Sequence, residues 1–175
     1  IQAASRCAAA PGHTAQPFQP TRSAKPFLRE AWERDILQNT KTAFGSLAGQ
    51  CAKQKGKAMV RDANLAAQSL YEGDVAFIDP PYSGVHYSRF YHVLETIARC
   101  ESVEVSGEGR YPAPELRPRS QYSVTTEAPT ALNELFSTIA SRGAKAIITF
   151  PYDTCSNGLS GLKVRTLAKK YFNFD

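Results

Sequence analysis

The 175-residue sequence has few cysteines, a single methionine and no long apolar segment. Its four cysteines, at positions 7, 51, 100 and 155, form no Cys-x-x-Cys pair, which argues against a zinc site and favours reduced thiols. No apolar run approaches the ~20 residues of a membrane-spanning helix. The first residues also lack the continuous apolar core of a signal peptide. We therefore expect a cytoplasmic protein without membrane association.

The composition is that of an ordinary globular protein. Hydrophobic residues make up 42% of the chain and charged residues 21%, and the length suffices for one domain with a core. Lysine and arginine number 21 against 16 acidic residues, a formal net charge of +5. Such a charge is compatible with a polyanionic partner but does not establish one.

One short stretch, residues 74–83, stands out from the rest. A short apolar run with good strand residues ends at Asp79-Pro80-Pro81-Tyr82. The two prolines have no N–H and a fixed φ, so a strand cannot continue through them. The pattern predicts a rigid loop at the carboxyl end of a buried strand, which is where open α/β sheets place their chemistry.

The remaining sequence alternates between helical and strand patterns. From residue 62 onward this alternation predicts an α/β fold with a mostly parallel sheet and flanking helices. The expected elements are a helix over 26–53 divided at Gly45, a strand over 59–62 ending in an acid, a helical turn over 63–71, a helix over 88–101, a long loop over 102–128, a helix over 127–142, a strand over 144–150, a helix over 159–171 and the start of a strand at 172–174. We expect residues 1–25 to form a loop or poorly ordered segment, 26–57 a helical segment, and 58–175 an α/β subdomain.

The Asp79-Pro80-Pro81-Tyr82 string resembles the motif of amino-methyltransferases, and most closely that of the Dam-like adenine-N6 DNA methyltransferases. The resemblance continues through residues 87–95 and, more weakly, from about residue 62 to the C-terminus. It implies a partial Rossmann-like fold, S-adenosylmethionine as the methyl donor and no metal. It further implies double-stranded DNA as substrate, a base-flipping mechanism and association with a restriction endonuclease.

The chemistry explains why these residue types suit methylation of a planar amine. The lone pair of an exocyclic amine is delocalised into the ring, so two acceptors aimed at its N–H bonds are needed to free it. The Asp79 carboxylate and the Pro80 carbonyl supply such acceptors, since proline keeps its C=O while its ring fixes where that group points. Pro81 stiffens the same loop, and Tyr82 offers a flat face on which an extruded base stacks. Asp79 to Tyr82 are therefore the expected catalytic residues.

Further roles follow from the resemblance alone. A strand-end acid shortly before the motif contacts the adenosine part of the donor in these enzymes, and Asp62 matches it here, with Asp79 also assigned to the cofactor site. The alternative for Asp62 is a helix N-cap. His86, Tyr87 and Arg89 lie just after the loop and are expected to meet, together with Tyr82, a target base or a phosphate. The corresponding enzymes often carry a Ser-Asn loop after the later strand, whereas residues 150–152 read Phe-Pro-Tyr.

One part of the resembled pattern is missing. These enzymes hold the methionine end of the donor with a Phe-x-Gly-x-Gly loop, and none of the glycines before the motif stands in that arrangement. We therefore expect the C-terminal part of a longer enzyme, inactive by itself. The resemblance then makes 26–57 the end of a target-recognition region and 58–175 an incomplete catalytic subdomain. The alternatives are an RNA adenine or cytosine-N4 methyltransferase and a non-catalytic nucleic-acid-binding remnant.

Overall fold

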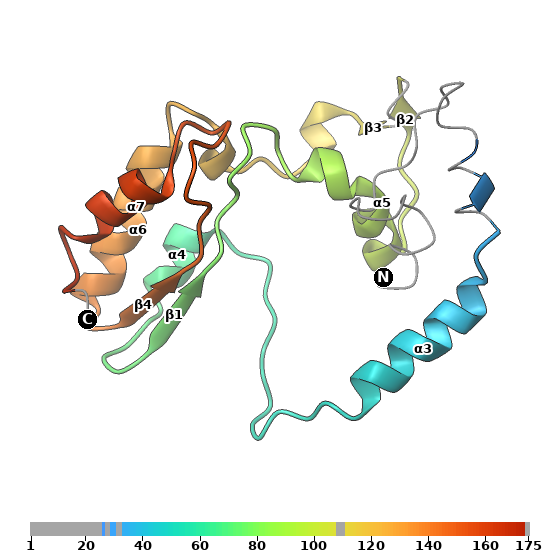
Figure 1. Ribbon diagram of the computed structural model, residues 1–175, viewed down its shortest axis with the longest axis horizontal. Helices are drawn as coiled ribbons and strands as arrows, with labels where there is room; N and C mark the ends of the chain where they lie inside the picture. The colour runs from blue at the N-terminus through green and yellow to red at the C-terminus, as the bar shows by residue number, and fades with distance from the viewer. Residues whose placement is uncertain (1–25, 27–28, 31–32, 108–110, 174–175) are drawn as a thin grey trace. The chain divides into compact units, whose positions relative to one another are not determined.

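The computed structural model describes residues 26, 29–30, 33–107 and 111–173, which belong to two compact units. The first unit comprises 1–57 and 87–118, and the second comprises 58–86 and 119–175. The loop expected over residues 1–25 lies outside the described residues. Figure 1 labels the elements along the chain.

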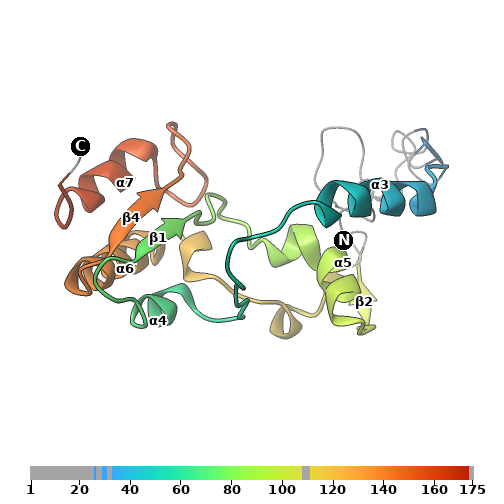
Figure 2. The ribbon, with the colours of Figure 1, turned by 90° about the horizontal axis from the view of Figure 1, so that it is seen from below.

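The second unit is built on a small parallel sheet. Strands β1 (Val75–Ile78) and β4 (Lys145–Ile148) pair in register from Val75 opposite Lys145 to Ile78 opposite Ile148, and lie side by side in Figures 1 and 2. Successive side chains of a strand point to opposite faces of the sheet. Ala76 and Ile78 belong to the packed core, whereas Phe77 and Ile147 are 68% and 54% exposed. The core therefore lies on one face of the sheet.

Three helices complete this core: α4 (Ala63–Ala67), α6 (Ala128–Ser141) and α7 (Gly161–Ala168). Buried side chains recur along α6 at helical spacing, which makes it the central helix of the unit. Phe136 is fully buried and meets Phe172 edge to face at 6.0 Å. A 3-10 turn, η2 (Gln121–Ser123), buries Tyr122 and Ser123 beside α6.

The first unit contains α3 (Ile36–Ala48), α5 (Ser88–Arg99), a short antiparallel pair of strands and a second 3-10 turn, η1 (Pro114–Leu116). The pair consists of β2 (Val105–Ser106) and β3 (Tyr111–Pro112). The expected long loop over 102–128 therefore contains short regular elements. In α5, the buried ring of His92 packs against Tyr111 at 5.2 Å.

Several expected boundaries are wrong. Helix α3 continues through Gly45 to Ala48, because a single glycine inside a helix costs only about 1 kcal/mol relative to alanine. The expected strand over 59–62 is absent; residues 58–61 have no regular structure and Asp62 is the N-cap of α4. Residues 172–173 form no strand, and 174–175 lie outside the described residues.

The predicted α/β class is confirmed at the level of mixed helices with a small parallel sheet. Within the part of the chain that the structure describes, no helix has both the length and the apolar character required to cross a membrane.

Replacing Phe136 by alanine tests the assignment of the core. Removal of a fully buried ring should cost about 3–5 kcal/mol of unfolding free energy. Leu162→Ala, at a side chain that is 70% exposed in the same unit, is the control and should cost far less. Denaturant unfolding measures both, and equal losses would contradict this core.

Candidate active site

Asp79 follows β1 directly, at the carboxyl end of the parallel pair. Thr149 stands at the equivalent place after β4, and its backbone N–H donates to the Ile78 carbonyl at 3.0 Å. The Thr149 hydroxyl then donates to Asp79 Oδ1 at 2.7 Å. Strand pairing thus brings together two side chains separated by 70 positions, and one carboxylate oxygen of Asp79 is engaged.

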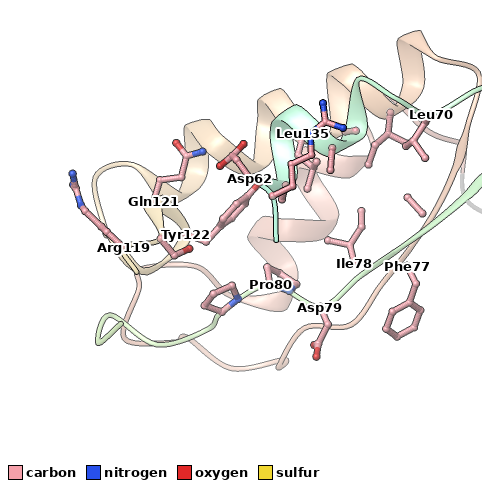
Figure 3. Close-up of a pocket in the computed structure, with 18 residues that line it drawn as sticks. Asp62, Leu70, Phe77, Ile78, Asp79, Pro80, Arg119, Gln121, Tyr122 and Leu135 are labelled. Atoms are coloured by element: carbon pink, nitrogen blue, oxygen red, sulfur yellow. The ribbon is translucent and has the colours of Figure 1, made fainter. Parts of the chain in front are cut away.

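A cleft of about 530 Å³ lies within the second unit, beside the end of β1. Its walls come from α4, the carboxyl end of β1, the segment 119–122 and α6, as Figure 3 shows. Most of the lining is apolar, including Leu70, Ile78 and Leu135. The polar members are Arg61, Asp62, Asp79, Arg119, Ser120, Gln121 and Tyr122. Asp79 and Pro80 also line the cleft, but the Asp79 carboxylate points away from its interior in Figure 3. The volume falls within the ~300–1,000 Å³ of small-molecule sites.

Asp62 stands at the cleft as the N-cap of α4. Its Oδ1 accepts a hydrogen bond from the Leu65 N–H at 3.0 Å, and its side chain is exposed. The capping alternative that the sequence left open is therefore correct. A cap uses one carboxylate oxygen, so the expected role of Asp62 in cofactor binding stays a prediction.

Tyr122 forms part of the opposite wall, and only 6% of it is exposed. Its hydroxyl donates to Asn64 Oδ1, and Asn64 Nδ2 donates to the Ala131 carbonyl at 3.1 Å. Burial raises the pKa of the Tyr122 phenol above its usual value, and the negative charges of Asp62 and Glu134 raise this pKa further. As a neutral donor, Tyr122 therefore ties η2 to α4, and Asn64 in turn ties α4 to α6.

The Asp-Pro-Pro-Tyr loop is also tied to the segment that follows β4. Asn157 Nδ2 donates to the Pro81 carbonyl at 2.9 Å, and Ser156 Oγ accepts from the Gly84 N–H at 2.9 Å. A Cβ on Gly84 would lie 2.7 Å from the Ser156 carbonyl oxygen, so this approach requires glycine. Sequence reasoning missed both Ser156 and Asn157, although this pair is a Ser-Asn dipeptide of the expected kind, placed farther along than expected.

The expected nucleic-acid residues fall in both units. Tyr82 is 49% exposed, and His86 Nδ1 accepts from the Ser120 N–H at 3.3 Å. Tyr87 and Arg89 begin α5 in the first unit, where the Arg89 guanidinium lies 5.0 Å from the centre of the Tyr111 ring. Their roles toward DNA stay predictions.

The model of one protein family matches residues 29–142, well over half of the chain: D12 class N6 adenine-specific DNA methyltransferase. The chain belongs to this family. The resemblance read from residues 79–82 is thereby confirmed, including adenine specificity and DNA methylation as the family's activity.

Two curated relatives of this D12-class chain are similar over part of its length. The type II methyltransferase M.FokI of Planomicrobium okeanokoites is 39% identical over 74 residues, 42% of this chain and 11% of that protein. The modification methylase LlaI of Lactococcus lactis subsp. lactis is 44% identical over 68 residues, 38% of this chain and 10% of that protein. The matched stretch thus spans only about a tenth of either relative. No solved structure matches the chain.

Among the described residues of this D12-class chain, no group of three or more His, Cys, Asp or Glu side chains is placed to hold a metal ion.

The raised pKa of Tyr122 predicts a pH dependence of stability. Its phenol keeps its proton in the folded chain above pH 10, the value at which an unperturbed tyrosine ionises. Its stabilisation is therefore present below pH 10 and is lost as pH rises toward the higher folded-state pKa. Between pH 9 and about 11, unfolding free energy should fall more steeply for the parent than for Tyr122→Phe.

Denaturant unfolding at successive pH values measures this difference. Tyr71→Phe, at a ring that is 74% exposed, is the control and should keep the parent's slope. Equal slopes in the parent and Tyr122→Phe would show that the phenol is not held neutral by burial.

Proposed function

We propose that this chain carries the catalytic loop of a DNA methyltransferase that transfers a methyl group from S-adenosylmethionine to the N6 amine of adenine. The observation that carries the proposal is the acid of the Asp-Pro-Pro-Tyr loop. Asp79 lies at the carboxyl end of β1, oriented by the Thr149 hydroxyl at 2.7 Å, beside a cleft of about 530 Å³. Membership of the D12 class supports the choice of adenine N6 over cytosine N4 and of DNA over RNA.

In this proposal Asp79 and Pro80 receive the two N–H bonds of the amine. Thr149 engages Oδ1 of Asp79, which leaves Oδ2 as the acceptor for one N–H. No described residue donates to the Pro80 carbonyl, which is the acceptor for the other. Acceptors that are already oriented draw the nitrogen toward a tetrahedral shape without reorganisation during the reaction. Asp79 or water then takes the released proton.

The cleft fits the adenosine part of the donor. Leu70, Ile78 and Leu135 form an apolar bed for a purine, and the free carboxylate oxygen of Asp62 stands at its edge. When bound, S-adenosylmethionine supplies a methyl group activated by a sulfonium. Asp62 and Asp79 are the proposed cofactor residues, since both line the cleft.

Double-stranded DNA is the proposed substrate, with the adenine extruded from the stack. Tyr82, with its ring half exposed, offers a stacking face worth ~1–3 kcal/mol per base. His86, Tyr87 and Arg89 are proposed to contact the base or the backbone, and the net charge of +5 is compatible with phosphate contacts. M.FokI is named a type II methyltransferase and LlaI a modification methylase, which supports a restriction–modification setting, with an endonuclease partner in the cytoplasm.

We also propose that residues 58–175 form an incomplete, partly Rossmann-like catalytic subdomain, preceded by the end of a recognition region at 26–57. The 175 residues contain no Phe-x-Gly-x-Gly loop to hold the methionine end of the donor. The isolated chain is therefore proposed to be inactive.

Asp79→Ala tests the catalytic assignment in the complete protein that carries this chain. Methyl transfer from labelled S-adenosylmethionine to adenine-containing duplex DNA should fall by roughly 100-fold or more, because a preorganised acceptor is lost. Asp153→Asn, at an exposed acid of the same unit, is the control and should retain activity. The same assay on RNA and on duplexes with cytosine as the only acceptor should give no transfer.

Methyl transfer to RNA or to cytosine would contradict the proposed acceptor of the methyl group, the N6 amine of adenine in DNA. Full activity of a folded Asp79→Ala variant, or no transfer by the complete protein to any nucleic acid, would leave the chain as a binding module.

Titration of the isolated 175-residue chain with S-adenosylmethionine tests its proposed inactivity. We expect binding weaker than micromolar and no methyl transfer, because the methionine end of the donor has no glycine loop to receive it. Micromolar binding in calorimetry would contradict this expectation.

A further inference from the structure

We propose that Thr149 and Asn157 are positioning residues that orient the two acceptors for the target amine, the Asp79 carboxylate and the Pro80 carbonyl. Both residues come from the end of β4 and the segment after it. Neither is assigned by the family match or by the motif itself. This inference rests on the proposed function and adds to it how the catalytic loop is held.

Asn157 is fully buried and clamps two backbone segments. Its Nδ2 donates to the Pro81 carbonyl at 2.9 Å and to the Tyr122 carbonyl at 3.0 Å, while its Oδ1 accepts from the Leu159 N–H at 3.2 Å. These partners determine the orientation of the amide. Reversing it would set the oxygen against two carbonyls and leave the Leu159 N–H facing a second donor.

The clamp on Pro81 sets the backbone next to the acceptor carbonyl. Pro80 and Pro81 carry consecutive carbonyls, and each proline ring fixes its own φ. With the Pro81 carbonyl bonded to Asn157, the remaining rotation of this dipeptide is restricted. The Pro80 carbonyl then keeps its own direction and, among the described residues, receives no hydrogen bond. An unpaired C=O with a fixed direction is what an amine N–H requires as an acceptor.

Thr149 orients the other acceptor, the Asp79 carboxylate. Its backbone N–H donates to the Ile78 carbonyl at 3.0 Å, so the residue is anchored to β1 next to Asp79. Its hydroxyl donates to Asp79 Oδ1 at 2.7 Å and selects one rotation of an otherwise exposed carboxylate. Oδ2 is left for the target amine. The strand β4 thus orients both acceptors, one through a hydroxyl and one through a buried amide.

Thr149→Val is the decisive variant, because it removes the hydroxyl with little change in shape at an exposed position. In the complete protein we expect kcat to fall roughly 10- to 100-fold, because the acceptor is no longer held in its reactive orientation. KM for DNA and for S-adenosylmethionine should stay within about twofold and Tm should be unchanged, since the bond acts on geometry during transfer. Thr149→Ser, which restores the hydroxyl, should recover most of the lost kcat.

Thr154→Val is the matched control, an exposed threonine in the segment after β4 for which no side-chain hydrogen bond is recorded. It should keep the parent's kcat. A folded Thr149→Val variant with unchanged kcat, or one whose loss appears only in KM or Tm, would overturn the role of Thr149.

Asn157 is tested without substitution, because loss of a buried amide endangers folding itself. In the parent, NMR should show slow solvent exchange of both Asn157 side-chain amide protons, since the residue is fully buried and each proton is donated to a backbone carbonyl. Rapid exchange of either proton would overturn the clamp.

The outcomes separate this inference from the proposed function. An active parent with an unaffected Thr149→Val variant overturns the inference and leaves the proposed function standing. A complete protein that methylates no nucleic acid overturns the proposed function, and with it the catalytic role of both residues.

Discussion

The parallel pairing of β1 with β4 is the constraint on which the rest of the site depends. Its register sets Ile78 opposite Ile148, so the residues that follow, Asp79 and Thr149, leave the sheet at the same edge. The backbone bond from Thr149 to Ile78 extends this pairing by one step. A shift of one residue would turn every side chain of the strand to the other face and separate the carboxylate from its hydroxyl donor.

Side chains near the end of β1 point to two opposite faces of the sheet. Alternation along the strand places Ile78 toward the core and the cleft, while Phe77 and Asp79 face the other way (Figure 3). The rigid proline loop lies between these faces. In the proposed function a nucleoside-sized part of the donor occupies the cleft, and the amine approaches the carboxylate. Helix α6 supports the arrangement because Asn64 of α4 donates to its backbone at Ala131, while Tyr122 donates to Asn64.

Local signals in the sequence were sufficient where a single segment decides its own structure. The apolar run before Asp79, the proline pair and the periodicity of residues 127–142 correctly predicted β1, its end and α6. They failed where tertiary context competes. Gly45 indicates a break in the sequence pattern, yet a glycine inside a helix costs only about 1 kcal/mol relative to alanine, so the helix continues through it. Residues 59–62 read as a strand but have no partner in the described sheet, and the Asp62 cap sets the local structure instead.

The sequence by itself determined the family and the position of the Asp-Pro-Pro-Tyr loop, because Asp79 to Tyr82 are contiguous and prolines fix the backbone wherever they stand. It did not reveal what holds that loop. Thr149 lies 70 positions from Asp79, and Asn157 lies 76 positions from Pro81. Nothing in the sequence around a threonine or an asparagine indicates a hydrogen-bond partner so far away in the chain. Tyr122 likewise looked like one aromatic residue in a polar segment. Only the tertiary structure, by pairing two strands distant in the chain, decided which side chains bond to Asp79 and Pro81 and which line the cleft.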